Sequence, residues 1–462
     1  MSSTIRSAGH FKAAALAVAL ASLAFSAATQ ARGLSHPIDA DYKGSVYVST
    51  SPVYPGATVD VEGEGFKPGQ DVQLLRDGDT ITTQPILRVD AEGNFKAQVQ
   101  LPPEAVVGVH PVVVQTVNPG FAEILDFKVS PKIPFSTQHD YNLKRAALNP
   151  GLFQGGYSAR NHAIFVTSAV GRRPVKQSSL MKINPSSLAV EAQITPAKTA
   201  DGTDIQAVYG LAVDDANDNV WVGNTRTGSV AVYRQSDLSL VKQFDNKIAP
   251  HNHGMAVDAK RNRAFVAADS ATYVNVFDTV SLQEIKRVEL VSPTRTKTPP
   301  EPISVAIDEN AGKAYVTADT HQVYVIDVAT LEIDKVFNLK GAKDPMGVAV
   351  APELGLIFVA AQGTDNVQIL NAADGSVKAD VKVGANPLAV TWDPVHKRAW
   401  VANRASDSVA VIDAHGNLTA NLPGGSYANH VFTDGKGVVW SLNKSRGDTD
   451  KTGDHISRFS FK

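Results

Sequence analysis

The sequence contains no cysteine. This absence excludes disulfide frameworks, thiolate metal sites, iron–sulfur clusters, thiol catalysis and covalent c-type haem attachment. An excess of charge of one sign is also missing, because 44 Lys and Arg residues stand against 46 Asp and Glu residues, so the composition does not indicate a nucleic-acid-binding protein. Hydrophobic residues make up 43% of the chain, which is enough for a large core and excludes a mainly disordered protein.

Recognisable catalytic motifs are missing too. The sequence has no Gly-x-Ser-x-Gly elbow, no His-Glu-x-x-His pair and no phosphate-binding glycine loop. We therefore assign no catalytic residue, no metal ligand and no cofactor from the sequence.

The N-terminus has the features of a secretory signal peptide, which we assign to residues 1–31. Arg6 and Lys12 precede an apolar run over 13–25, and small residues follow, with cleavage predicted after Ala28 or Ala31. The apolar run is too short for a membrane span, which needs about 20 residues, and no later segment could span a membrane. Cleavage at Ala31 leaves 42 cations and 46 acids, a formal charge of −4. We expect an exported, periplasmic protein.

Residues 43–131 read as short strands separated by turns. Alternating apolar and polar residues run through 95–101, and Pro55-Gly56, Asp77-Gly78 and Glu92-Gly93-Asn94 supply turn conformations. About seven strands in about 90 residues favour a β-sandwich. The string from Val59 to Gly69, followed by the Asp-x-x-Gly-x-Phe hairpin at 90–95, resembles bacterial Ig-like (IPT-like) domains.

Residues 135–462 repeat a unit of four predicted strands every 41 to 56 residues. A strand of small residues ending near an aspartate is followed by a strand with a central aromatic, then by an apolar strand and a more polar one. The clearest first strands are 210–214, 254–258, 304–308 and 347–351, and the second strands include 220–222, 264–266, 314–316 and 399–401. Seven such units predict an all-β fold with a seven-bladed β-propeller after the sandwich.

The last repeat ends after three strands. An open ring would expose two strand edges, so a strand from elsewhere must complete it. We expect residues 141–147, just before the first repeat, to supply this outer strand.

The repeat strings Tyr315-Val316-Thr317-Ala318 and Trp400-Val401-Ala402-Asn403 resemble the YVTN-type propeller repeat. The order of features over 135–462 resembles the YncE-like group of exported seven-bladed propellers. That resemblance implies a propeller fold, and it raises DNA as a partner, because some members of the group are regarded as DNA-interacting. The Ig-like segment departs from the shorter members of the group.

A ring of polar residues is predicted at the mouth of the propeller channel, just before each first strand. The repeat places equivalent positions at one end of the ring, and most of them are polar although the strands that follow are apolar. They could bind a polar ligand, or they could simply be solvated loop residues. The candidate ligand-binding residues are His251, His253, Glu301, Asp344, Asn386, Tyr427 and His430.

Two basic loops are the best candidates for phosphate contact. Their residues are Arg172, Arg173, Lys176, Arg295 and Lys297. Cations on loops are also common as plain solvated surface.

Together these features favour a non-enzymatic binding or scaffold protein in the periplasm that recognises a protein or small molecule at the propeller face. The first alternative is a metal-assisted hydrolase or lyase that uses the channel-mouth ring. The second is a propeller that binds DNA, with single-stranded DNA as the partner; the formal charge of −4 argues against it.

Overall fold

The computed structural model describes residues 39, 41–117, 120–172, 174–199, 201–293 and 298–462. The predicted signal peptide lies outside these residues. The chain divides into two compact units, which are described separately. Among the described residues, the first comprises 39, 41–49 and those within 60–99 and 111–125, and the second comprises those within 50–59, 100–110 and 126–462. No helix in the described part is long and apolar enough to cross a membrane.

The N-terminal strands form two antiparallel sheets, with strand orders β1-β2-β6 and β4-β3-β7-β8; β5 pairs with β3. The strands are β1 (Ser45–Val48), β2 (Thr58–Glu64), β3 (Asp71–Arg76), β4 (Asp79–Thr80), β5 (Leu87–Arg88), β6 (Phe95–Gln100), β7 (Gly108–Val117) and β8 (Phe121–Val129). The sequence predicts about seven strands over residues 43–131, and eight strands lie in the described part of that range.

The alternation in β6 has the expected consequence. Phe95 and Val99 are buried, and Lys96 between them is exposed. Gly63 on β2 is required by this packing, because a Cβ there would lie 2.1 Å from a ring carbon of Phe95. The Asp90 carboxylate accepts the N–H groups of Glu92 and Asn94, which closes the turn before β6.

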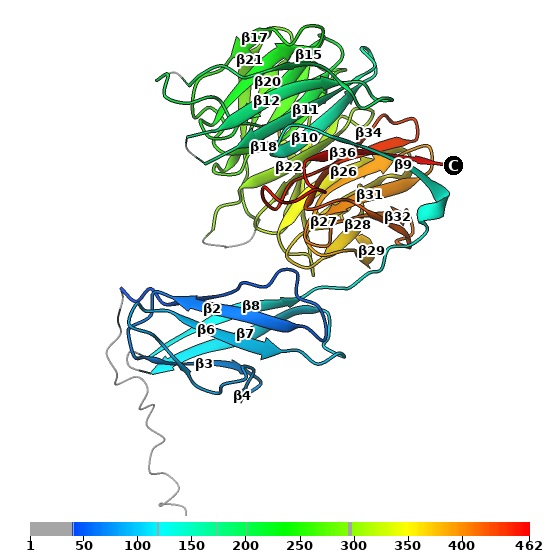
Figure 1. Cartoon of the computed structure of the whole chain (residues 1–462). Helices are drawn as coiled ribbons and strands as arrows, with labels where there is room; N and C mark the ends of the chain where they lie inside the picture. The colour runs from blue at the N-terminus through cyan, green and yellow to red at the C-terminus, as the bar shows by residue number, and fades with distance from the viewer. Residues whose placement is uncertain (1–38, 40, 118–119, 173, 200, 294–297) are drawn as a thin grey trace, which may run out of the picture. The chain divides into compact units, whose positions relative to one another are not determined.

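The second unit contains seven four-stranded antiparallel sheets among the described residues (Figure 1). We number them 1 to 7 in chain order and call the first strand of each its inner strand. Sheet 1 contains β10 (Leu152–Ser158), β11 (Ala163–Val170), β12 (Gln177–Ile183) and β13 (Val190–Ile194), and sheet 2 contains β14 (Val208–Asp214), β15 (Asn219–Asn224), β16 (Ser229–Arg234) and β17 (Leu240–Gln243). Sheet 3 contains β18 (Asn252–Asp258), β19 (Arg263–Ala268), β20 (Tyr273–Asp278) and β21 (Gln283–Glu289). Sheet 4 contains β22 (Pro302–Asp308), β23 (Lys313–Ala318), β24 (Gln322–Asp327) and β25 (Ile333–Asn338).

Sheet 5 contains β26 (Pro345–Ala351), β27 (Leu356–Ala361), β28 (Asn366–Asn371) and β29 (Val377–Lys382). Sheet 6 contains β30 (Pro387–Asp393), β31 (Arg398–Asn403), β32 (Ser408–Asp413) and β33 (Leu418–Pro423). Sheet 7 contains β34 (Ala428–Thr433), β35 (Val438–Asn443), β36 (His455–Phe461) and β9 (Tyr141–Ala147). Two short 3-10 helices, η2 (Gln138–Asp140) and η3 (Pro352–Leu354), complete the described elements.

The inner strands contact one another in order, and β34 of the last sheet contacts β10 of the first. They approach closely because they carry small residues. A Cβ on Gly254 would lie 2.6 Å from the carbonyl oxygen of Ile303 on the next inner strand, and one on Gly347 would lie 2.9 Å from the Cα of Ala389. The aromatic residue of each second strand is buried where neighbouring sheets pack together. These residues are Phe165, Trp221, Phe265, Tyr315, Phe358, Trp400 and Trp440.

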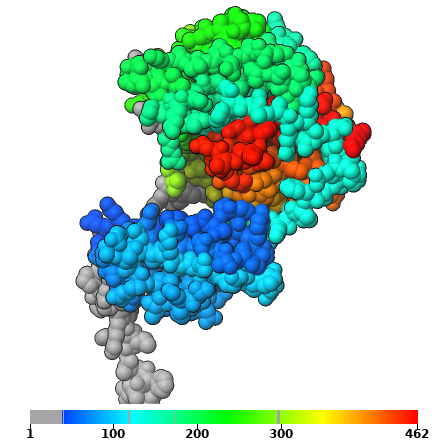
Figure 2. Space-filling model, viewed as in Figure 1, coloured from blue at the N-terminus to red at the C-terminus, as the bar shows by residue number. Residues whose placement is uncertain are grey.

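The last sheet is completed by the strand that precedes the first one, as the sequence predicts. β36 pairs with β9 along its whole length, from His455 opposite Ala147 to Phe461 opposite Tyr141. In Figure 2 the cyan segment before β10 lies against the red C-terminal segment. The two ends of the repeat array are therefore held together by backbone hydrogen bonds.

We predict that Lys144→Pro destabilises the second unit. The ladder bonds flanking β9, Leu148 N–H to Asp454 and Lys462 N–H to Asp140, place Lys144 in the hydrogen-bonded register of the antiparallel pair. Proline there removes a ladder donor, which we expect to lower the free energy of unfolding by about 1–3 kcal/mol. Urea denaturation of the variant and of a Lys144→Ala control measures this. Equal midpoints for the two variants would contradict this role of the β9 pairing.

Candidate functional site

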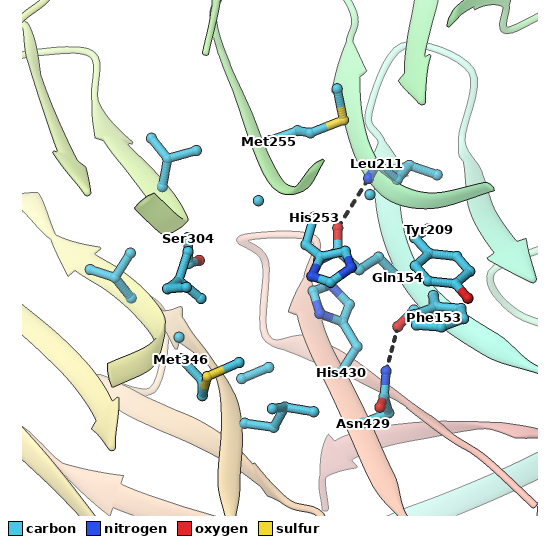
Figure 3. A pocket seen from close by; sticks show the side chains of 18 of the residues that line it. Phe153, Gln154, Tyr209, Leu211, His253, Met255, Ser304, Met346, Asn429 and His430 are labelled. Atoms are coloured by element: carbon cyan, nitrogen blue, oxygen red, sulfur yellow. Dashed lines mark hydrogen bonds between the residues drawn. The ribbon is translucent and has the colours of Figure 1, made fainter. Parts of the chain in front are cut away.

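A cavity of about 410 Å³ runs between the inner strands, and residues from all seven of them line it (Figure 3). Most of its wall is apolar or backbone. Its polar lining residues are Gln154, His253, Ser304, Arg404, Asn429 and His430.

Several of these polar side chains connect neighbouring inner strands. The Gln154 side-chain oxygen accepts the N–H of Leu211 at 3.0 Å, and the Asn429 amide donates to the Phe153 carbonyl at 3.0 Å. His430 lies 3.2 Å from the Gly155 carbonyl oxygen through Nε2, and burial lowers the pKa of His430 to about 4, so the ring is neutral. His430 therefore lies in the channel wall and links strands β34 and β10.

The predicted mouth residues share one backbone conformation. His251, Asp344, Asn386 and Tyr427 each have a φ between 49° and 54°, immediately before an inner strand. This left-handed conformation is uncommon outside glycine. It turns the chain into the inner strand, so these four positions have a structural role whatever else they do.

The backbone carbonyls of four predicted mouth residues also accept hydrogen bonds from the loop that follows the second strand of the same sheet. The carbonyls of Glu301, Asp344, Asn386 and Tyr427 accept the N–H of the first residue after that strand in their own sheet. These partner residues are Asp319, Gln362, Arg404 and Lys444. A second set of side chains is thereby fixed beside the predicted one.

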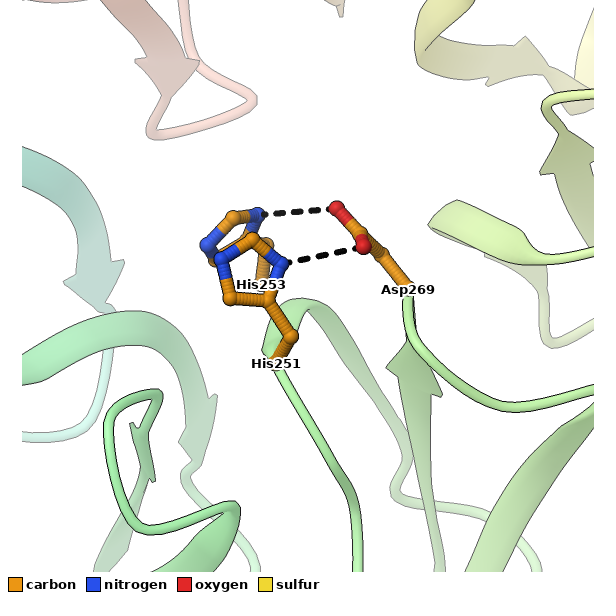
Figure 4. Close-up of side chains that lie close together, drawn as sticks. All are labelled: His251, His253 and Asp269. Atoms are coloured by element: carbon orange, nitrogen blue, oxygen red, sulfur yellow. Dashed lines mark ion pairs between the residues drawn. The ribbon is translucent and has the colours of Figure 1, made fainter. Parts of the chain in front are cut away.

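His251 and His253 meet Asp269, which is the residue that follows the second strand of sheet 3 (Figure 4). His251 Nδ1 lies 3.0 Å from one carboxylate oxygen, and His253 Nδ1 lies 3.8 Å from the other. The Asp269 hydrogen bond raises the pKa of His251. Burial, together with the charge on His251, lowers the pKa of His253 to about 4. On a single carboxylate the cluster thus holds one imidazole whose charged form is stabilised and one whose neutral form is favoured.

Glu301 belongs to the same side of the mouth. Burial raises its pKa, and the negative charges of Asp319 and Asp269 act in the same direction. Among the described residues, no contact joins Asp344 to this cluster. The Asp344 carboxylate instead lies beside Gly363, where an added Cβ would be 2.5 Å from one of its oxygens. Sheets 3 and 4 therefore form an acidic side of the mouth.

Sequence reasoning missed a basic side. Three cations follow second strands in sheets 2, 6 and 7, and each lies over an aromatic ring: Arg226 over Tyr209 at 5.6 Å, Arg404 over Tyr427 at 4.9 Å and Lys444 over Phe153 at 3.3 Å. The signal was present in the repeat, because Asn224, Asn403 and Asn443 end the second strands shortly before these cations. The predicted ring consists of residues at the start of the inner strands, whereas these cations follow the second strands.

Two of the rings beneath these cations, Phe153 and Tyr209, belong to a continuous stack. The rings of Phe153 and Tyr209 lie 3.5 Å apart with an interplanar angle of 17°, and Tyr209 stacks on His253 at 5.7 Å. This stack joins inner strands of sheets 1, 2 and 3 and links the basic side to the His251–His253 pair, whose rings are 4.6 Å apart.

The predicted phosphate-contacting residues are only partly within the described chain. Arg172 and Lys176 are exposed on the loop between β11 and β12, and Lys176 lines a surface cavity of about 410 Å³. Arg173, Arg295 and Lys297 lie outside the described residues. The nucleic-acid assignment stays a prediction.

The ring of four-stranded sheets around a lined channel defines a β-propeller protein. No family model matches the chain. It is 22% identical over 332 residues to the uncharacterized protein YncE of Salmonella typhi, covering 67% of this chain and 88% of that protein, and equally to YncE of Salmonella typhimurium.

Solved structures support the same fold. A chain of Kuenenia stuttgartiensis hydrazine synthase aligns with a TM-score of 0.54 at 17% identity, over 64% of this chain and 93% of that one. The WD40 repeats of RRP9 align with a TM-score of 0.57 at 11% identity, over 72% of this chain and 100% of that one. At these identities the likeness establishes the fold alone.

We predict that, because of Lys444, the free energy of unfolding increases as the pH rises above neutrality. Burial, reinforced by Arg404 and Arg226 and opposed by Asp454, lowers the pKa of Lys444 from 10.5 to about 7. The unfolded chain then binds more protons than the folded one between these values, so the free energy of unfolding increases across this window, by at most about 1.4 kcal/mol per pH unit.

Chemical denaturation of the wild type and Lys444→Met between pH 7 and 10 measures this difference. The variant should lose the Lys444 contribution to the slope, and Lys436→Met, which removes an exposed lysine of the β34–β35 turn, should keep it. Identical slopes in all three proteins would contradict the shifted pKa of Lys444.

Proposed function

We propose that this chain is an exported binding protein that recognises a small ligand or a partner's side chain at the mouth of its propeller channel. In this proposal the seven sheets are the blades of a seven-bladed propeller, and the N-terminal sheets form an Ig-like sandwich. The single observation that carries the binding role is the cavity of about 410 Å³, whose lining comes from all seven inner strands and whose mouth combines charged and aromatic side chains. Such concave, mostly apolar cavities with a few convergent polar groups are typical of ligand sites.

The mouth is rigid, which supports selective recognition. Its residues are held by left-handed turns and by hydrogen bonds to the neighbouring loops, so little conformational entropy is lost when a ligand binds.

We predict that filling the channel abolishes ligand binding. Met346 on β26 lines the cavity, so Met346→Trp should occupy it while the sheets remain. A ligand found in a thermal-shift screen of small metabolites should raise the melting temperature of the wild type; at one hundred times its dissociation constant it adds about 2.7 kcal/mol of stability. The variant should show no shift.

Circular dichroism of the variant confirms that its sheets persist, and Lys436→Met provides a folded control with an unaltered channel. A screen whose hits stabilise Met346→Trp as strongly as the wild type would place binding elsewhere and overturn this proposal.

Export is a separate part of the proposal, supported by the charged, apolar and small-residue order of residues 1–31. We predict that cells with two membranes accumulate the chain in the periplasm and that mass spectrometry of this material shows loss of residues 1–28 or 1–31. A version lacking residues 1–31 should stay in the cytoplasm. Retention of the intact N-terminus in the periplasmic fraction would contradict cleavage.

A metal-assisted hydrolase is the second candidate, and the His251, His253 and Asp269 group favours it, because one ligand atom from each lies within 4.8 Å of the others. Two imidazoles and a carboxylate suit Zn²⁺. The Asp269 carboxylate, however, is already engaged by His251, and Arg226 places positive charge near both histidines. Calorimetric titration of the wild type and of His253→Ala with zinc tests this candidate. It is eliminated if the wild type binds no zinc or if His253→Ala binds zinc equally well.

A further inference from the structure

The basic side of the mouth gathers positive charge from three separate sheets. Lys444 and Arg404 follow the second strands of sheets 7 and 6, and Arg226 lies after that of sheet 2. Arg404 lines the cavity itself and donates to the Asn429 side-chain oxygen at 2.6 Å. The Arg226 guanidinium donates to the Tyr209 hydroxyl at 3.0 Å. These contacts fix the two guanidinium groups next to the channel opening.

Lys444 and Arg404 lack the carboxylate partner that a nearby cation has. Arg446, two residues after Lys444, binds the Asp407 carboxylate through its two terminal guanidinium nitrogens, at 2.8 and 2.6 Å. Within the described part of the chain, no carboxylate lies within ion-pair distance of Lys444 or Arg404. The Lys444 ammonium instead faces the Phe153 ring.

This arrangement is electrostatically unfavourable without a ligand. Burial lowers the pKa of Lys444 and of Arg404, and the charges of Arg404 and Arg226 lower that of Lys444 further. Asp454 acts on Lys444 in the opposite direction but does not cancel these effects. Like charges held together at a partly dehydrated site are relieved when an anion binds between them.

The shape of the site limits the size of that anion. Arg404, Phe153 and Tyr209 all line the cavity of about 410 Å³, which accommodates a small molecule. The stacked faces of Phe153 and Tyr209 offer apolar contact beside the cations. Lysine and arginine donors bind carboxylate and phosphate oxygens through short, charge-assisted hydrogen bonds.

We propose that the channel mouth binds a small molecule through an oxyanion, a carboxylate or a phosphate, which Lys444 and Arg404 hold while the rest of the ligand lies against Phe153 and Tyr209. This inference rests on the proposed binding function and names the chemical class of its ligand. Arg226 adds positive charge at the far side of the same aromatic stack.

Isothermal titration calorimetry with sodium phosphate and with sodium succinate tests the proposal, in dilute buffer near pH 8 and with sodium chloride as the ionic-strength control. We expect saturable binding of at least one oxyanion. Lys444→Met and Arg404→Met should each weaken it roughly tenfold or more, the loss typical of one charge-assisted contact. Lys436→Met should bind as the wild type does.

A second readout separates ligand contact from a structural role. An oxyanion bound to Lys444 favours its charged form, so binding near pH 8 should take up protons, at most about one per site. Titrations in HEPES and in Tris, which differ in ionisation enthalpy, measure this uptake. Lys444→Met should lose it, whereas Lys444→Arg should retain binding without it.

Each outcome decides the question. A response to phosphate alone or to succinate alone identifies the oxyanion. Binding that sodium chloride reproduces, binding unaffected by Lys444→Met and Arg404→Met, or no saturable binding of either anion would overturn the proposal. If a screened ligand loses binding in Met346→Trp and keeps it in Lys444→Met, the proposed binding function stands and the oxyanion inference fails.

Discussion

The whole arrangement depends on how closely neighbouring inner strands approach. Gly254 and Gly347 lie where any side chain would collide with the backbone of the next inner strand, so the spacing of the sheets near the axis is set by main chain against main chain. Packed interiors resist deformation, so this spacing varies little. The wider gaps farther out are filled by the buried aromatics of the second strands. Closure then needs one more interaction, the pairing of β9 with β36.

That constraint explains why the mouth can bring together residues from distant parts of the sequence. In sheets 5, 6 and 7 a left-handed residue precedes the inner strand, and its carbonyl holds the loop after the second strand. The side chains on these loops are therefore positioned by the ring. Arg226 and Lys444 influence each other electrostatically although most of the second unit separates them in the sequence.

The fold was predictable because its signals are local and repeated. Alternation, turn residues and the aromatic second strand identified the sheets, and the unpaired third strand of the last repeat identified β9 as its partner. The site was predictable only in part. The sequence singled out His251 and His253 but not Asp269, which follows a different strand. His430 lies in the channel wall, since its position two residues into β34 turns it onto Gly155.

The cations were missed for a physical reason. A lysine or arginine on a loop reads as solvated surface, and nothing in the sequence of Lys444 indicates burial or a missing carboxylate. The near-neutral net charge of the chain also hides the asymmetry, because Asp269, Glu301 and Asp319 lie on sheets 3 and 4 while Arg404 and Lys444 lie on sheets 6 and 7. A mouth with charge of opposite sign on its two sides has an electric field across its opening, and the charges that produce it cancel in any composition count.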